Sequence, residues 1–174
     1  MTWQDNLNRL RACDEAVEWT QNYKTFPAAW KTCKRGDWML WLAARSGVDR
    51  KVLVLAACAC ARTALKHVTK GEERPRVAIE TAERWARGEA TIEEVRAAAA
   101  AAADADAVYA ATAVYAAAAA AASDAAADAA YAADAAAAAT SDAAAARTKS
   151  LSHSAGLVRK HITAAMIEEG WAKP

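Results

Sequence analysis

Aromatic and basic side chains crowd one stretch of this sequence of 174 residues, and tryptophan, tyrosine and arginine are the residue types that dominate binding surfaces. If residues 35–47 form a helix, Trp38, Trp41 and Arg45 share one face, because they are spaced i, i+3 and i+7. This pattern predicts a binding surface; the other interpretation is a tryptophan-rich core. The aromatic residues of the stretch are Trp19, Tyr23, Phe26, Trp30, Trp38 and Trp41.

A second group of basic residues, Arg74, Arg76 and Arg84, lies at and beyond the predicted N-terminus of a helix. The free backbone N–H groups at such an end attract anions, so the pattern predicts an anion or phosphate site. If the ligand is a nucleotide, Arg62 joins this group and a tryptophan stacks on the base. The alternative is that the arginines are solvated and pair with nearby glutamates, which are Glu73, Glu80 and Glu83.

Catalytic motifs do not appear in the sequence: it has no glycine-rich phosphate loop, no Gly-x-Ser-x-Gly and no His-Glu-x-x-His. We therefore expect a protein that is not an enzyme and uses no cofactor. Cys58 and Cys60 do not predict a metal site, because side chains two apart on a helix point about 200° away from each other. We expect these cysteines in the core, and at least two of the three histidines at the surface.

The elements that must position these residues are all predicted to be helices. Apolar residues at helical spacing (Leu7, Leu10, Cys13 and Val17) predict one amphipathic helix over about residues 3–23. Further helices are expected to begin near Pro27, at Asp37 and Asp49 as N-caps, at Pro75 and at Thr91, which forms a capping box with Glu94. Gly47, Gly71 and Gly88 are expected to end helices, and residues 147–174 are expected to form a C-terminal helix.

An alanine tract spans residues 97–146, where alanine fills 35 of 50 positions. Alanine has the highest helix propensity, so the tract is predicted to form closely packed helices with breaks near residues 104–106, 123–124 and 140–142. The tract carries six aspartates and no basic residue. Asp124, Asp128 and Tyr131 would lie along one line of a helix, which offers an alternative, acidic binding surface; the other interpretation is that the aspartates keep an alanine-rich surface soluble.

Charge and composition limit the class of protein. The net charge is only +1, so nothing points to a specific nucleic-acid partner or to a membrane surface, and no run is long and apolar enough to span a bilayer. Four cysteines without a signal peptide fit reduced thiols in a cytoplasmic protein. We expect one all-α domain over residues 1–174, a helical bundle or array with a Trp/Arg-rich part (1–96), alanine-rich helices (97–146) and a C-terminal helix (147–174).

Two segments carry a resemblance to a known family. "RGDWMLWLA" at residues 35–43 and "RPRVAIETAERWARGEAT" at residues 74–91, followed by the alanine tract, resemble the immunity protein family Imm-five. The similarity covers roughly residues 12–165. That family was proposed from polymorphic-toxin loci and is also widespread in phages, so the resemblance implies a protein that neutralises a toxin or effector by direct binding.

Two functions from different classes follow. In the first, the protein is an immunity protein or inhibitor that covers a toxin or a defence effector. In the second, it is a phage counter-defence protein that sequesters a small anionic immune signal of the nucleotide type, or inhibits a host defence protein. The sequence leaves the oligomeric state open, a homo-oligomer included.

Overall fold

A computed structural model describes residues 2–103 and 144–172, and in these residues it contains helices and no strand. This confirms the all-α, single-domain fold that the sequence predicts. The helices are α1 (Trp3–Arg9), α2 (Asp14–Thr20), α3 (Phe26–Thr32), α4 (Gly36–Arg45), α5 (Arg50–Ala61), the 3-10 helix η1 (Arg62–His67), α6 (Arg74–Arg87), α7 (Ile92–Ala103), α10 (Ala144–His161) and α11 (Ala164–Ala172).

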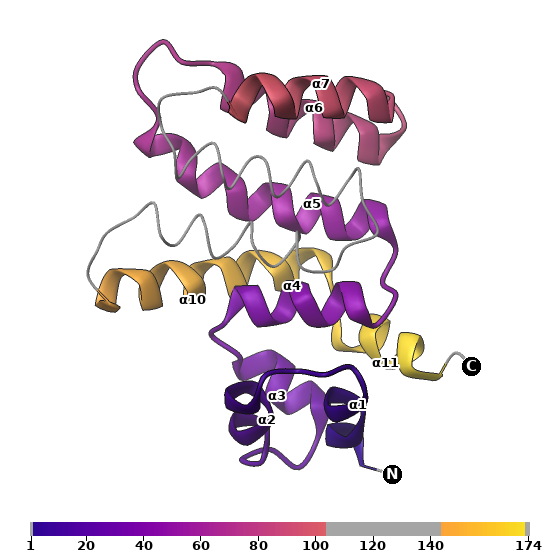
Figure 1. Cartoon of the computed structure of the whole chain (residues 1–174). Coiled ribbons are helices and arrows are strands. Elements are labelled where there is room, and N and C mark those ends of the chain that lie inside the picture. The colour runs from indigo at the N-terminus through magenta and orange to yellow at the C-terminus, as the bar shows by residue number, and fades with distance from the viewer. Residues whose placement is uncertain (1, 104–143, 173–174) are drawn as a thin grey trace.

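The helices form an array in which α4, α5, α6 and α7 pack in succession (Figure 1). The α6–α7 pair lies at one end, and α5 packs against α6. Helix α10, although it comes late in the chain, packs on both α4 and α5. The short helices α1, α2 and α3 lie at the opposite end of the array, where α11 packs against α3.

Several predicted helix boundaries are confirmed. The Asp49 carboxylate accepts hydrogen bonds from the backbone N–H groups of Lys51 and Val52, at 2.9 and 3.2 Å, and so caps α5. Thr91 and Glu94 form the predicted capping box at the start of α7. Gly88 ends α6 with a φ of 83°, a left-handed conformation that glycine adopts without steric penalty.

The predicted helix over residues 3–23 is wrong, because the chain breaks it into α1 and α2. Helix α1 ends in a Schellman motif, in which the N–H of Ala12 bonds to the carbonyl of Leu7 and the N–H of Arg11 to that of Asn8. Arg11 occupies the left-handed position with a φ of 62°. The apolar spacing continues across this break, so it concealed the change in direction.

The predicted cap at Asp37 is also wrong. Helix α4 already begins at Gly36, and the Asp37 side chain lies in its first turn without capping the helix. The carboxylate instead accepts two hydrogen bonds from the Arg35 guanidinium, at 2.9 Å from Nε and 2.6 Å from Nη2. An available arginine two residues away is the stronger partner, because both groups are charged.

The C-terminal segment forms two helices in place of one. The chain turns at Ile162, whose carbonyl accepts a hydrogen bond from the Trp30 indole at 3.3 Å, and Thr163 then caps α11 by accepting from the N–H of Met166 at 3.4 Å. The helix predicted between Asp49 and Gly71 is divided into α5 and the 3-10 helix η1, which ends at His67, before Gly71.

Small side chains allow the helices to approach closely. Ala78 and Ala82 of α6, together with Ala102 of α7, are completely buried. Cys58 and Cys60 are buried core residues and His67 and His153 are exposed, as the sequence predicts. The three expected breaks in the alanine tract lie within residues 104–143, outside the described residues. None of the described helices combines the length and apolarity that a membrane crossing requires.

Candidate functional site: a tryptophan-lined pocket

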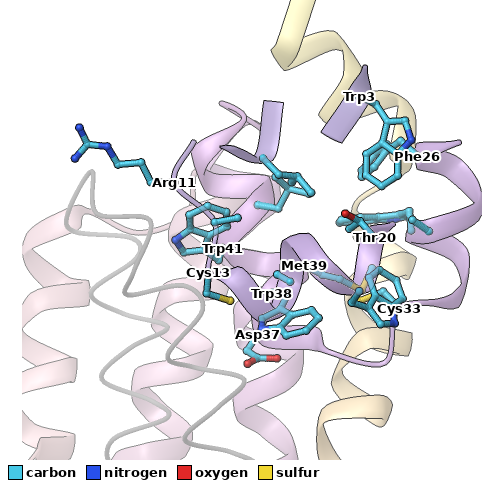
Figure 2. Close-up of a pocket in the computed structure, with 17 residues that line it drawn as sticks. Trp3, Arg11, Cys13, Thr20, Phe26, Cys33, Asp37, Trp38, Met39 and Trp41 are labelled. Carbon is cyan, nitrogen blue, oxygen red and sulfur yellow. The ribbon is translucent and has the colours of Figure 1, made fainter. Parts of the chain in front are cut away.

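An apolar pocket of about 360 Å³ lies among the four N-terminal helices (Figure 2). Its walls come from α1, α2, α3 and α4 and from the link between α1 and α2. Pockets of this size that are mostly apolar, with a few polar groups, are typical of ligand sites. The tryptophan pocket, as we call it, is lined by six aromatic residues, Trp3, Trp19, Phe26, Trp30, Trp38 and Trp41.

The aromatic walls contact one another, which fixes their positions. The ring centroid of Phe26 lies 5.6 Å from that of Trp3 and 5.7 Å from that of Trp30. On the other side, the rings of Trp19 and Trp38 meet edge to face at 6.2 Å. Both arrangements are ones that aromatic pairs favour. The pocket is therefore bounded by rings that hold one another in place.

An ion pair fixes the Trp38 wall. The Arg35 guanidinium lies 4.2 Å from the centre of the Trp38 ring, in cation–π contact, and at the same time holds the nearly buried Asp37 carboxylate. Arg35 also reaches Glu15 of α2 at 3.3 Å. Asp37 lines the pocket, but its negative charge is matched by Arg35.

Helix α10 fixes the α3 side of the pocket from behind. Nη1 of Arg159 donates hydrogen bonds to the carbonyls of Trp30 and Cys33, at 3.1 and 2.8 Å. These carbonyls belong to the last turn and C-cap of α3, whose outer carbonyl groups lack partners within the helix. A cation at this end also interacts favourably with the helix dipole. A residue distant in sequence thus positions the two pocket-lining residues.

Arg11 and Cys13 lie at the rim, in the link between α1 and α2. Both are exposed, and Figure 2 shows the Arg11 guanidinium directed away from the tryptophans. Arg11 is the one non-glycine residue with a positive φ among the residues described. For a residue other than glycine this conformation costs roughly 1–2 kcal/mol. The sequence thus keeps an arginine where glycine is usual.

Several side chains that line the pocket carry hydrogen-bond donors without an acceptor in the described residues. Within the described parts of the chain, the Arg11 guanidinium and the indole N–H groups of Trp19, Trp38 and Trp41 have no acceptor. The three tryptophans are half-buried. The Thr20 hydroxyl donates to the carbonyl of Val17 at 2.7 Å, and its oxygen still has acceptor capacity.

The structure brings together two of the residues that the sequence analysis selected. Trp38 and Trp41 both line the pocket. Arg45, on the same helix, is exposed and does not line it; its Nη2 donates to the carbonyl of Leu10 at 3.4 Å, which ties α4 to the end of α1. Of the three residues predicted to share a binding face, Trp38 and Trp41 therefore form part of the pocket wall, and Arg45 lies outside it.

The other arginines lie away from this pocket and have partners within the chain. Arg62 forms two hydrogen bonds with Glu83, both 2.8 Å long, and joins the end of α5 to α6. Arg74 pairs with Glu72 and lowers the pKa of that carboxyl to about 2. Arg76 lies 2.9 Å from Glu73, and Arg84 donates to the carbonyl of Glu89 at 3.1 Å. The arginines therefore have partners within the chain, as in the alternative interpretation of the sequence. Glu72 and Glu89 take part in place of Glu80.

Sequence reasoning missed several residues of the site. The predicted helix over residues 3–23 contains Trp3, Arg11 and Cys13 within one continuous element, so it gives no indication that they line a pocket. The signal was present in part, because Trp19, Phe26 and Trp30 belong to the aromatic stretch. The alternative acidic surface, Asp124, Asp128 and Tyr131, lies outside the described residues.

No group of three or more histidine, cysteine or acidic side chains in the described part of the chain could hold a metal ion. Comparisons with models of protein families, with curated proteins and with solved structures found no match to this chain. The interpretation of the site therefore depends on its own geometry.

Proposed function

We propose that this protein is a non-enzymatic binding protein and that it takes a compact aromatic group of its ligand into the tryptophan pocket. The observation that carries this proposal is the pocket itself: about 360 Å³, lined by six aromatic residues. Apolar surface that leaves water on binding contributes roughly 25 cal/mol per Å², and ring contacts add to this.

Preorganisation supports the proposal. The walls are held by ring contacts, by the Arg35–Asp37 pair and by Arg159, so a ligand does not have to order them. Binding to a preformed site avoids the entropic cost of immobilising side chains. Three of the tryptophans are half-buried, so each has exposed surface that a ligand can cover.

The experiment fills the pocket without removing any wall. Ala16 of α2 lines the pocket and is half-buried, so Ala16→Phe places a ring inside it. Naphthylmethanol, a neutral aromatic probe, is titrated into each protein by calorimetry. We expect binding by the wild type and loss of binding by Ala16→Phe. Ala28→Phe, at an exposed position of the neighbouring helix α3, is the matched control and should bind like the wild type.

A second candidate is the immunity function that the family resemblance implies, in which the ligand is a protein toxin or defence effector. The observation that favours it is the group of half-buried tryptophans at the pocket, since tryptophan is enriched at the energetic centres of protein interfaces. An aromatic or large aliphatic side chain of the partner would enter the pocket.

Co-expression with the product of the gene immediately upstream tests the immunity function. If that product is the partner, it co-purifies with the wild type and with Ala28→Phe, and not with Ala16→Phe. Loss of the partner in Asp128→Ala, with retention in Ala16→Phe, would move the site to the acidic tract. If none of the proteins retains the partner, the immunity function with this gene product is wrong.

Sequestration of a nucleotide-type signal at Arg62, Arg74, Arg76 and Arg84 has less support. Each of these side chains has a partner within the chain, and none lines the tryptophan pocket. A phosphate would have to displace those partners. A nucleotide that bound and was released by Arg76→Ala, but not by Ala16→Phe, would restore this candidate.

A further inference from the structure

The charge and hydrogen-bonding character of the pocket rim narrows the class of ligand. This step rests on the proposed function, because it concerns the ligand of the same pocket. Among the residues that the structure describes, two charged ones line the pocket, Arg11 and Asp37. Asp37 is paired with Arg35, whereas Arg11 has no partner among the described residues, so the charge that a ligand can reach is positive.

Asp37 does not offer its charge to a ligand. Both carboxylate oxygens accept hydrogen bonds from Arg35, and the side chain is only 11% exposed. A cationic ligand would have to compete with a guanidinium that is already in place and is itself held by Trp38 and Glu15.

Arg11 is in the opposite situation. It is exposed, and no described residue accepts a hydrogen bond from its guanidinium or pairs with it. Its backbone is fixed in the left-handed position that ends α1, so the side chain starts from a defined point on the rim. Although the guanidinium points away from the rings in Figure 2, an exposed arginine changes rotamer freely and can turn to a ligand in the pocket.

The neutral polar groups have the same preference. The indole N–H groups of Trp19, Trp38 and Trp41 are donors only, and they have no acceptor in the described parts of the chain. An acceptor group of a ligand suits these donors, whereas two side-chain acceptors among the described lining residues are already engaged: the Thr20 hydroxyl donates to Val17, and Arg35 binds the Asp37 carboxylate.

We infer that the natural ligand is a small aromatic anion, an apolar ring that carries a carboxylate or a similar acidic group. The ring enters among the tryptophans, and the acidic group stays at the rim, where Arg11 lies. The acidic group thereby remains near water, which avoids the penalty of burying a charge.

Three probes with one ring system and different charges test this inference: naphthoate, naphthylmethanol and naphthylmethylammonium, each titrated by calorimetry. We expect the wild type to bind the anion most tightly and the cation least. An exposed ion pair is worth up to about 1 kcal/mol, so the anion should be preferred over the neutral probe by roughly two- to fivefold.

Arg11→Gly should abolish this preference, so that naphthoate and naphthylmethanol bind with equal affinity. It should not lower the melting temperature, because glycine suits the left-handed position. Arg11→Lys keeps the charge and should keep most of the preference. Arg9→Gln, which removes an exposed arginine of α1 that does not line the pocket, is the matched control and should behave like the wild type.

The outcomes separate this inference from the proposed function. If no probe binds the wild type, the pocket is not a ligand site and the proposed function fails with the inference. If all three probes bind equally well, or if Arg11→Gly retains the preference for naphthoate, the pocket binds aromatic groups but the inferred anion is wrong. A preference for the cation would also contradict the inference.

Discussion

The cysteines illustrate how burial separates side chains of one type. Cys58 and Cys60 lie in the core, and loss of solvation raises the pKa of both thiols, that of Cys60 to about 12. Cys33 is also buried with a raised pKa. Cys13 is exposed at the rim of the tryptophan pocket.

This difference predicts the reactivity of the folded protein. Alkylation requires an accessible thiolate, so iodoacetamide at neutral pH should modify Cys13 and spare the three buried thiols. Mass spectrometry should detect one adduct in the native protein and four in denaturant, one for each cysteine. Rapid native modification of Cys58 or Cys60 would show that the core opens more readily than its packing indicates.

The same pKa shifts predict a loss of stability at high pH. A thiol with a pKa raised above its ordinary value of 9.0 stabilises the folded state below pH 9, and this contribution is lost as the pH rises from there toward about 12. The Cys60 thiol should therefore lower the free energy of unfolding by about 1.4 kcal/mol per pH unit in this window. Urea denaturation at pH 8 and above should show a shallower fall for Cys60→Ala than for the wild type.

The contact between α4 and α10 determines whether a glycine can be replaced by a larger residue, as Gly36 and Gly156 show. Gly36 at the start of α4 faces α10, where a Cβ atom would lie 2.6 Å from Cβ of Ser154 and 2.8 Å from the backbone nitrogen of Ala155. A Cβ atom at Gly156, on α10 itself, would meet nothing within 4 Å. The contact between α4 and α10 therefore requires glycine at position 36 and not at position 156.

Replacement of each glycine by alanine should change stability in opposite directions. Gly36→Ala must push α4 away from α10 and should lower the free energy of unfolding by roughly 1–3 kcal/mol. Gly156→Ala should raise it by about 0.5–1 kcal/mol, because alanine is the better helix former. Urea denaturation measures both. Equal effects would contradict the close contact between α4 and α10.

The basic residues of α6 belong to the surface of this helix array. The Arg76–Glu73 pair is largely exposed, so Arg76→Ala should change the free energy of unfolding by less than about 1 kcal/mol. If the tryptophan pocket is the binding site, Arg76→Ala should also bind naphthylmethanol with unchanged affinity. Weaker binding would place the site at the arginines of α6 that the sequence analysis selected.

Across the whole molecule, the sequence predicts the helices better than their spatial relations. Caps such as Asp49 and terminators such as Gly88 are local signals, and both appear where expected. The break at Arg11 has no such signal, because an arginine replaces the usual glycine. The placement of α10 against α4 and α5 is a long-range contact, which no local pattern encodes.

The residues of the candidate site divide in the same way, into those that a local pattern predicts and those that long-range contacts bring in. Trp38 and Trp41 were selected because they share a helix face, which depends on spacing alone. The turn between α1 and α2 brings Trp3 and Arg11 to the same pocket. Arg159 supports the pocket through its hydrogen bond to the carbonyl of Trp30, which is 129 residues away in sequence. The places of Trp3, Arg11 and Arg159 at the pocket follow only from the tertiary structure.

The central claim, that the tryptophan pocket binds an aromatic group, is tested most directly by the indole N–H signals in a ¹H–¹⁵N NMR spectrum. The seven tryptophans should give seven such signals. On titration with naphthylmethanol, the signals of Trp19, Trp38 and Trp41 should shift, and that of Trp85, which lies on α6 beside Arg50, should not. If the Trp85 signal shifts and those of the pocket tryptophans stay in place, the claim is contradicted.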